Sequence, residues 1–323
     1  MPTTLRVTTF NVENLFNRYA FLDLSWDQRH YEQFVEATGV VSIASRQGDL
    51  VSYAITEIQR NNTALAILDA QPDMLAVQEI ENIYTLRNFN DEYLDNYFDR
   101  VLSIDGNDLR GIDVGLLIKK ERTDIEIVNI RTHVEDAEKG KSVMRHSLGG
   151  KGYLVTGAIF SRDCLEIDLA VGGKTLTLLI NHCKSQDGRK ASDTKRTEQA
   201  QRVAELVNIA AQAGKVPIVL GDLNASPENK TIEALLKHPL LQNPFVLLPQ
   251  IEMWTHYYVP DKTVSQLDYV LPYHDVKIVG QPEVVRKGLT TKCKQYVGPR
   301  YPTIGPQHTE ASDHCPTTVV VEV

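Results

Sequence analysis

The stretch Val216-Pro-Ile-Val-Leu-Gly-Asp-Leu-Asn-Ala225 constrains this chain more than any other. Its first half is apolar and β-branched, which is typical of a buried strand. Gly221 interrupts the run, and Asp222 and Asn224 follow two residues apart, so both side chains leave an extended segment on the same side. The pattern taken alone also fits a strand end capped by ordinary turn residues. The rest of the sequence is therefore needed to distinguish a capped turn from a functional site.

Composition describes an ordinary globular protein. The 323 residues are within reach of one large two-sheet domain, and we expect a single domain over residues 1–323. The hydrophobic share of 42% and the charged share of 24% are those of a soluble protein. The formal net charge of −8 gives no overall attraction to nucleic acid, so a polyanion would have to meet a local basic patch or bound cations.

The sequence also bears on membranes, compartment and partners. No apolar run approaches the roughly 18 residues that a membrane span requires, so we expect none. The first residues do not have the pattern of a signal peptide, although a leader removed earlier would leave no trace. The absence of Cys-x-x-Cys spacing favours reduced thiols over zinc or disulfides at the four cysteines, Cys164, Cys183, Cys293 and Cys315. We expect a cytoplasmic monomer without an implied protein partner, with secretion left open.

Hydrophobic patterns predict more strands than helices, spread along the whole chain. Strands are expected near residues 5–12, 74–80, 98–104, 112–118, 125–130, 153–160, 165–171, 174–182, 216–221, 266–271 and 316–321. Helices are expected over 50–69, 85–97 and 197–213, with a short one near 232–236. Residues 17–48 indicate helix and loop, 131–150 a long surface loop, 185–194 a basic loop, and Val171-Gly-Gly-Lys174 a hairpin turn. This mixture favours one α/β sandwich.

Polar residues end, or closely adjoin, several of the apolar runs: Asn11, Glu79, Asn181-His182, Asp222 with Asn224, and Asp313-His314, with Asp268 inside a further run. Each has an ordinary explanation as a turn, ion-pair or core residue. Their number indicates that the strand ends converge. Carboxylates suit Mg²⁺, Mn²⁺ or Ca²⁺. A base such as Asp222 can orient a water, and metal, amides and an arginine can stabilise a phosphoryl transition state. The predicted chemistry is phosphoester hydrolysis.

Seven short motifs carry a family resemblance. They are Thr-Phe-Asn-Val-Glu-Asn at 9–14, Gln-Glu-Ile-Glu at 78–81, Arg-Gly-Ile-Asp-Val-Gly at 110–115, Asn-His-Cys-Lys-Ser at 181–185, Gly-Asp-Leu-Asn at 221–224, Leu-Asp-Tyr-Val at 267–270 and Ser-Asp-His-Cys-Pro at 312–316. In this order they resemble the endonuclease/exonuclease/phosphatase superfamily, which includes deoxyribonuclease I. The resemblance runs from residue 5 to 321. It implies a four-layer αββα sandwich, with two mostly antiparallel sheets face to face, helices outside and the active site at one end.

The resemblance also implies a metal site and a histidine pair. Glu79 would be the principal metal ligand, with Asn11 and Asp313 as further ligands in some members. The expected ion is Mg²⁺, with Mn²⁺ or Ca²⁺ as alternatives. His314 would contact the scissile phosphate or activate water, and Asp268 would hold its ring.

The remaining roles implied by the resemblance concern the water and the phosphate. Asp222 would position and deprotonate the attacking water, and Asn224 would hold a non-bridging oxygen. His182 would be a general acid or a phosphate ligand. Asn181 and Lys184 would assist His182. Arg110 falls where some members place an arginine that touches phosphate.

Two further features follow from the residues themselves. The segment with Lys184, Arg189, Lys190, Lys195 and Arg196 would either track a nucleic-acid backbone or form a solvated start of a helix. Cys183 and Cys315 each follow a candidate catalytic histidine, and strand alternation directs them into the core. The sequence therefore argues against a Cys-His nucleophile pair.

The sequence thus predicts a divalent-metal-dependent phosphodiester hydrolase. We expect a nuclease that cleaves DNA, with RNA left open, because Asn-His-x-Lys-Ser is similar to the motif of nuclease-like members. A phosphatase or phospholipase acting on an inositol phosphate, sphingomyelin or a nucleotide is the first alternative, kept open by the acidic pI of 5.6. The second is a non-catalytic binding protein on the same fold, against which the complete set of polar residues argues.

Overall fold

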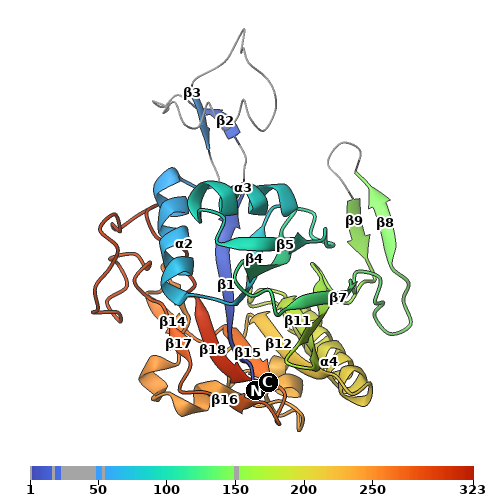
Figure 1. Ribbon diagram of the computed structural model, residues 1–323. Helices are drawn as coiled ribbons and strands as arrows, with labels where there is room; N and C mark the ends of the chain where they lie inside the picture. Colours follow the sequence, from blue (N-terminus) through green and yellow to red (C-terminus); the bar gives the residue numbers. More distant parts are fainter. Residues whose placement is uncertain (1, 17–18, 23–48, 53–54, 149–152) are drawn as a thin grey trace.

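The computed structural model contains two β-sheets that pack face to face and carry helices on their outer sides (Figure 1). It describes residues 2–16, 19–22, 49–52, 55–148 and 153–323. Apolar side chains from both sheets form one continuous cluster between them. This arrangement is the predicted four-layer α/β sandwich.

The first sheet has the strand order β16-β18-β1-β4-β6-β5, with β17 also paired to β18. Its strands are β1 (Thr4–Leu15), β4 (Met74–Ile80), β5 (Phe98–Ser103), β6 (Asp113–Lys119), β16 (Lys277–Ile278), β17 (Glu283–Val284) and β18 (Thr317–Glu322). β1 and β4 run parallel, whereas the other paired neighbours run antiparallel.

The second sheet has the order β15-β12-β11-β10-β7. Its strands are β7 (Glu126–Arg131), β10 (Cys164–Val171), β11 (Lys174–His182), β12 (Val216–Asp222) and β15 (Asp268–Pro272). β11 and β12 are its parallel pair. β10 and β11 form the predicted hairpin, in which Gly172 and Gly173 both have positive φ. Both sheets are therefore mostly antiparallel, as expected.

Strand alternation decides which side chains meet between the sheets. In β12, Ile218 and Leu220 join the inter-sheet cluster, whereas Val219 packs on the outer side. In β11, Leu178 and Ile180 face inward by the same rule. The next inward positions along these two strands are Asp222 and His182. The inter-sheet layer therefore turns polar at one end, where the candidate site lies.

Helices cover both outer faces (Figure 1). α2 (Glu57–Ala70) and α3 (Ile83–Tyr93) cover the first sheet, and α4 (Lys190–Gln212) covers the second. The shorter elements are η2 (Lys230–Ile232), α5 (Glu233–Leu236), η3 (Pro244–Leu247) and η4 (Gln250–Glu252). A ribbon of β13 (His256–Tyr258) and β14 (Thr263–Ser265), which the patterns did not predict, lies beside the site.

The helix predicted over 50–69 is wrong at its start, and some of the apolar residues whose helical spacing predicted it are exposed. Residues Asp49–Ser52 form β3, which pairs with β2 (Tyr19–Leu22), and α2 begins only after the capping box of Thr56. Leu65 and Ile58 are exposed. The buried face instead carries polar side chains such as Thr63, whose hydroxyl donates to the carbonyl of Ala311 at 2.6 Å. Satisfied hydrogen bonds thus accompany the apolar contacts that Ala64, Ala66 and Ile67 of this helix make with the first sheet.

Two predicted loops also contain regular structure. The segment 131–150 includes β8 (Met144–Ser147), which pairs with β9 (Tyr153–Thr156) in a projecting hairpin (Figure 1). α4 begins at Lys190, earlier than predicted, so half of the expected 185–194 loop is helical. Of the helix and loop expected over 17–48, only residues 19–22 are described, and they form β2; the rest of that prediction lies outside the described residues. Within the described chain, no helix has the length and apolar character to cross a bilayer.

Candidate active site

A cavity of about 660 Å³ opens where the inter-sheet layer becomes polar. Both sheets and the β13–β14 ribbon contribute to its walls. Its lining includes eight residues important for the chemistry: Asn11, Glu13, Glu79, Arg162, His182, Asp222, Asn224 and His314. The strand ends that the sequence singled out therefore converge on one space.

Asp222 lies at the centre of this cavity and is held by three hydrogen bonds. Its Oδ1 accepts the backbone N–H of Asn224 at 2.8 Å. Its Oδ2 accepts the side-chain amides of Asn11 and Asn224, each at 3.1 Å. Burial raises the pKa of Asp222 to about 6, although the nearby His314 opposes this shift. The result is a fixed carboxylate that is a better base than a solvated aspartate.

His314 connects Asp222 to a buried aspartate behind it. Its Nδ1 lies 2.8 Å from Asp268 Oδ2, which also accepts the Thr255 hydroxyl at 2.6 Å. Its Nε2 lies 3.8 Å from Asp222 Oδ2. Burial lowers the pKa of His314, but the carboxylates of Asp268 and Asp222 outweigh it and hold that pKa well above the usual value. His314 is thus an oriented imidazolium at neutral pH.

His182 differs from His314 in its charge. Its Nε2 lies 3.5 Å from Asp222 Oδ2 and 3.7 Å from Glu79 Oε1. Burial, and next the positive charge of Arg162, hold the pKa of His182 well below its ordinary value. The ring is therefore neutral at pH 7. A neutral imidazole suits a hydrogen bond to phosphate better than it suits proton donation to a leaving group.

Three carboxylates form an acidic corner of the cavity: Glu13, Glu79 and Asp313. Asp313 donates its backbone N–H to Glu13 Oε2 at 2.9 Å. Burial, and next the charge of Asp313, raises the pKa of both Glu13 and Glu79. Such crowding of buried carboxylates is unfavourable by itself and is relieved by a hard divalent cation, whose preferred ligands are carboxylate oxygens. The donor set thus fits the metal that the family resemblance implies.

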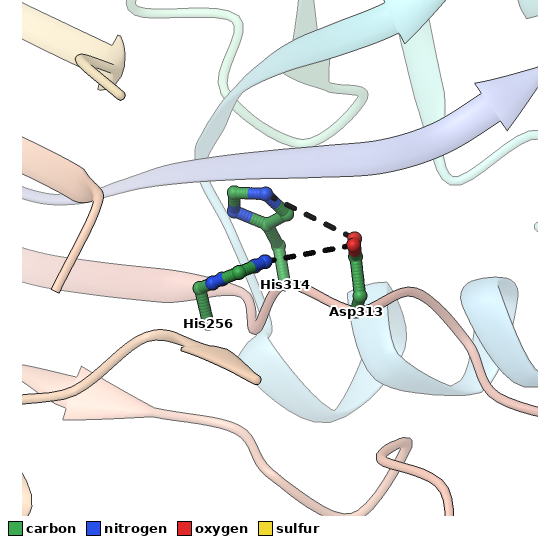
Figure 2. A group of neighbouring side chains, drawn as sticks. All are labelled: His256, Asp313 and His314. Atoms are coloured by element: carbon green, nitrogen blue, oxygen red, sulfur yellow. Dashed lines mark ion pairs between the residues drawn. The ribbon is translucent and has the colours of Figure 1, made fainter. Parts of the chain in front are cut away.

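The two histidines at this corner lie next to each other and both face Asp313 (Figure 2). His256 Nε2 lies 3.5 Å from Asp313 Oδ2, and His314 Nε2 lies 3.9 Å from Asp313 Oδ1. The ligand atoms of these three residues lie within 4.8 Å of one another. The hydrogen bond from His256 and the positive charges of both histidines outweigh the effect of burial, so the pKa of Asp313 is lowered. Asp313 therefore stays ionised beside the two glutamates.

Arg162 supplies a buried positive charge to the cavity, and the sequence patterns did not single it out. Its side chain is almost fully buried, its Nη1 donates to the carbonyl of Cys183 at 3.0 Å, and its Nε lies 3.3 Å from Asp108 Oδ2. Arg162 lies two residues before the start of β10. Since β10 runs antiparallel to β11, the start of one lies beside the end of the other, and Cys164 pairs with Asn181. The sequence patterns pointed to polar residues at the ends of strands, whereas Arg162 comes before the start of one.

Glu13 and His256 also line the cavity, and the sequence patterns did not predict either of them as a site residue. Glu13 adjoins Asn11 in the same motif and has a left-handed backbone with φ of 48°, an unusual conformation that is often found at functional sites. His256 lies on the unpredicted β13, whose backbone bridges to His314. Nothing in the local pattern around His256 marks it, because only the tertiary fold brings it to the cavity.

Several predicted residues do not line this cavity. Asn181 lies on the outer face of β11, since it alternates with the inward His182, and its amide donates to the Leu179 carbonyl at 2.9 Å. Asp268 lies behind His314 rather than in the cavity wall. Lys184 lines an adjoining cavity of about 550 Å³, which shares Arg110 and Arg162 with the first.

The basic segment is only partly available for a polyanion. Arg196 is fully buried, where it donates to the carbonyl of Lys184 and to Thr231 Oγ1, both at 2.8 Å. Neither of the two expected roles, contact with a nucleic-acid backbone or a solvated start of a helix, fits Arg196, because this buried side chain joins α4 to the segment after β11 and to η2. Lys195 hydrogen-bonds to Glu138.

The two cysteines beside the histidines point away from the cavity, as predicted. Cys183 packs in the cluster under α4 and Cys315 in a separate apolar cluster. Burial raises the pKa of the Cys183 thiol to about 12. Neither thiol is therefore available as a nucleophile.

Comparison with known proteins agrees with this geometry. Residues 9–314 match the model of the Endonuclease/Exonuclease/phosphatase family. The chain belongs to this family, whose members hydrolyse phosphoesters, and it is thus a hydrolase acting on ester bonds. Comparison with curated proteins finds no significant match.

Solved structures show the same fold at low sequence identity. Truncated TDP2 from Caenorhabditis elegans is 14% identical, with a TM-score of 0.57 over 99% of this chain and 98% of that one. The human Nocturnin catalytic domain with bound sulfate is 18% identical, with a TM-score of 0.58 over 99% and 93%. A mannosyl-6-phosphatase from Bacteroides thetaiotaomicron is 14% identical, with a TM-score of 0.59 over 98% of both chains.

Proposed function

We propose that this protein is a divalent-metal-dependent phosphodiesterase that cleaves nucleic acid, with DNA as the favoured substrate. The observation that carries the proposal is the position of Asp222. This basic carboxylate lies 3.8 Å from a charged histidine, His314, which also borders the acidic corner at Asp313, in a cavity that also contains a buried arginine. Hydrolysis of a phosphate diester needs a base for water, positive charge around the phosphate and a cation, and the cavity offers groups for each.

Asp222 and Asn224 would act on the attacking water and the phosphate. Asp222 Oδ2 accepts a proton from a water placed between it and the phosphorus, and the hydrogen bonds from Asn11 and Asn224 keep this oxygen oriented. The Asn224 amide donates to Asp222 Oδ2 and to the carbonyl of Cys183, and it would exchange one of these hydrogen bonds for one to a non-bridging oxygen. A fixed base and a fixed donor remove much of the orientation cost of the step.

The positively charged and neutral donors would hold the phosphate. His314, kept charged and oriented by Asp268, faces the same space as Arg162 and donates through Nε2. His182 adds a neutral donor rather than a general acid. Arg110, at the boundary with the second cavity, would contact a neighbouring phosphate.

Glu79, Glu13 and Asp313 would hold the metal, with Asn11 beside them. Carboxylate ligands suit Mg²⁺, with Mn²⁺ or Ca²⁺ as alternatives. When bound, the ion would supply positive charge that stabilises the phosphoryl oxygens in the transition state.

Two features favour a polymer over a small monoester. The catalytic cavity continues into a second one through Arg110, Arg162 and Ser185, so a chain can extend beyond the scissile phosphate. The donors there are cationic. A small phosphoester remains the second candidate because a similar structure is a mannosyl-6-phosphatase.

The test is hydrolysis of a substrate panel with Mg²⁺ or Mn²⁺ by the native protein and by Asp222→Asn. The panel contains plasmid DNA, single-stranded DNA, RNA, mannose 6-phosphate and an inositol phosphate. Nicking or shortening of DNA that Asp222→Asn lacks supports the proposal. Phosphate release from the small esters, with intact nucleic acid, would instead assign a phosphatase. No hydrolysis of any substrate, with metal bound, would contradict an enzymatic role for these groups.

A further inference from the structure

His256, Asp313 and His314 form a cluster that the proposed function uses only in part. In that function Asp313 holds the metal and His314 contacts the phosphate, whereas His256 has no role. The ring centroids of the two histidines are 4.6 Å apart, and both Nε2 atoms face the Asp313 carboxylate, at 3.5 and 3.9 Å (Figure 2). All three residues line the catalytic cavity, so an ion from solution can reach them.

The backbone holds this cluster in place. The two histidines form an antiparallel β-bridge with each other. Next to the bridge, the N–H of Tyr257 donates to the carbonyl of Asp313 at 2.9 Å, and the N–H of Cys315 donates to the carbonyl of Thr255 at 2.8 Å. The three side chains are therefore presented from one hydrogen-bonded unit rather than from independent loops.

Each of the two rings also has a partner on the nitrogen that faces away from Asp313. His314 Nδ1 lies 2.8 Å from Asp268 Oδ2, and His256 Nδ1 lies 3.3 Å from Ser265 Oγ. In metal centres a ligating histidine is oriented in the same way, by a partner on the ring nitrogen that does not bind the ion. Both Nε2 atoms are thus left to face one carboxylate.

The spacing of these atoms suits a small transition-metal ion. Tetrahedral Zn²⁺ binds imidazole nitrogen at about 2.0–2.1 Å and carboxylate oxygen at about 2.0–2.2 Å, which places two ligand atoms roughly 3.3–3.5 Å apart. The distance from His256 to Asp313 is already 3.5 Å, and the three ligand atoms lie within 4.8 Å of one another. Small side-chain rotations would therefore complete the site.

We propose that His256, Asp313 and His314 form a second cation site, which takes a late first-row divalent ion such as Zn²⁺ and inhibits the hydrolase when occupied. Two histidines and one carboxylate are a ligand set that Zn²⁺ uses with a fourth position open to water. Imidazole suits Zn²⁺, whereas Mg²⁺ prefers oxygen ligands. The acidic corner keeps Glu13 and Glu79 for its own ion, and the two oxygens of Asp313 can serve both.

Inhibition follows from the atom that the ion uses. An ion at this site takes the lone pair of His314 Nε2, and the proton on that nitrogen is released to solvent. The same nitrogen donates to the phosphate in the proposed function, so a metal-bound His314 no longer donates there. Asp268 and Asp222, at 2.8 and 3.8 Å from the ring, favour a dication as they favour the proton. The inhibitory effect rests on the proposed function, whereas binding of the ion does not.

The first experiment measures binding without any substrate. Tag-free protein in excess Mg²⁺ is titrated calorimetrically with Zn²⁺, and the visible spectrum of added Co²⁺ reports nitrogen coordination. The native protein should bind one Zn²⁺. His256→Gln and His314→Gln should each weaken this binding at least about tenfold, since losing even an outer partner of a ligand typically costs that much. The four cysteines are buried, so their thiols are not accessible to the added ion.

His274→Gln is the matched control for these variants. His274 lies outside the lining of the catalytic cavity and pairs with Asp275 at 2.9 Å. Its replacement should leave the affinity for Zn²⁺ unchanged. The melting temperature of each metal-free variant shows whether it is folded. Equal Zn²⁺ affinity in the native protein and His256→Gln, or no binding by the native protein, would overturn the inference.

The second experiment adds Zn²⁺ at fixed Mg²⁺ to the reaction on the substrate that the panel identifies. Each protein is compared with its own rate without Zn²⁺, and the Zn²⁺ concentration that halves the rate should rise at least about tenfold in His256→Gln. Unchanged inhibition in this variant, relieved by more Mg²⁺, would place Zn²⁺ at the acidic corner and overturn the inference. Stimulation by Zn²⁺ would also overturn it. If no substrate is hydrolysed, the proposed function fails, while the binding experiment still decides whether the site exists.

Discussion

At the scale of single residues, the site depends on charges that the fold keeps out of water. Asp222 and His314 face each other at 3.8 Å with opposite expected charges, and Arg162 lies in the same cavity almost fully buried. A buried charge acts more strongly than a solvated one because water does not screen it. The contribution of each group therefore depends on its burial as much as on its chemistry.

Arg162 gives the first prediction. Arg162→Ala should lower kcat by roughly 10²–10³, because it removes a fixed positive charge from the transition state. Arg162→Lys should recover only part of the loss, since a lysine does not reproduce the guanidinium that donates to Cys183 and faces Asp108. The measurement is steady-state kinetics on the substrate identified by the panel, with the melting temperature of each variant beside it.

Arg110→Ala is the matched control for this prediction. Arg110 lines the same cavity, but its side chain is 63% exposed and pairs with Asp108 at 3.1 Å. Its removal should act mainly on KM, by about tenfold or less, since solvent screens its charge. Equal kcat losses for the two variants would contradict the distinction between the buried and the exposed arginine.

At the scale of elements, β12 carries Asp222 and depends on Gly221. The backbone of Gly221 has φ of +132°, and a Cβ there would lie 1.9 Å from the carbonyl oxygen of Asn181 on β11. That oxygen belongs to the neighbouring strand, so it has little room to shift. Gly221→Ala should cost on the order of 3 kcal/mol or more of unfolding free energy, or prevent folding.

Gly214→Ala tests whether positive φ or the close contact causes this loss. Gly214 follows α4 with φ of +73°, but a Cβ there would meet nothing within 4 Å. Its substitution should cost only about 1 kcal/mol, from backbone strain alone. The measurement is urea unfolding of both variants, and similar losses would contradict a steric role for the strand contact.

His133 gives a second prediction at the scale of elements. Its ring hydrogen-bonds with Glu166 on β10 and with Asp136, which in turn pairs with Arg202 on α4. Its ring nitrogens lie 3.0 Å from Asp136 Oδ2 and 3.0 Å from Glu166 Oε2. Burial lowers the pKa of His133, but the hydrogen bonds with these carboxylates outweigh it and raise that pKa to about 9. Three further charged groups adjoin this cluster: Arg202 lies 2.7 Å from Asp136, Arg131 lies 2.9 Å from Glu166, and Asp163 accepts the His133 backbone N–H.

The sign of the pH effect follows from the raised pKa. A folded pKa above the unfolded value of about 6.5 means that the ring stabilises the fold fully below pH ~6.5 and loses this contribution as the pH rises through 9. His133→Gln should therefore lose on the order of 1–2 kcal/mol at pH 6 and little above pH ~10. Urea unfolding at pH 6, 8 and 10 measures this. The exposed His146→Gln is the control, and a pH-independent difference for His133→Gln would contradict the prediction.

The sequence predicted strands and turns best where apolar and polar residues follow a simple local pattern. The hairpin of β10 and β11, the strand before Asp222 and the four-layer arrangement all follow from alternation, turn residues and motif order. The polar part of the buried face of α2 could not be predicted from the local pattern. Thr63 is buried there, and its hydroxyl donates to the carbonyl of Ala311, which is far away in the sequence. Asn181 is a different case. Alternation alone separates it from His182, and applying that rule to both residues would have removed it from the predicted phosphate contacts.

At the scale of the whole molecule, the site lies where the two sheets end together. The inward positions of β11 and β12 change from leucine and isoleucine to His182 and Asp222 within two residues, so the apolar core directly supports the polar groups. Arg162 and His256 come from the start of a strand and from an unpredicted ribbon. Only the packing of the two sheets brings them to the same cavity, which explains why local patterns did not identify them.

The acidic corner connects this arrangement to the stability of the whole protein. Without a cation, Glu13, Glu79 and Asp313 repel one another in a buried space, and burial together with this repulsion raises the pKa of both glutamates. A divalent ion that binds only the folded protein adds about 2.7 kcal/mol when its concentration is a hundredfold above Kd. Millimolar Mg²⁺ or Mn²⁺ should therefore raise the melting temperature, and EDTA should reverse the change.

Glu13→Gln separates metal binding from a general effect of salt. With one negative charge removed from the corner, the metal-free variant should melt at a higher temperature than the native protein, yet gain less on addition of the metal. Glu121→Gln, at an exposed residue that pairs with Lys119 at 3.8 Å, should behave like the native protein. A metal-dependent rise of equal size in all three proteins would show that the ion does not bind at this corner. The opposite signs of the two effects in Glu13→Gln arise because the carboxylate that destabilises the empty corner is also a ligand for the ion that fills it.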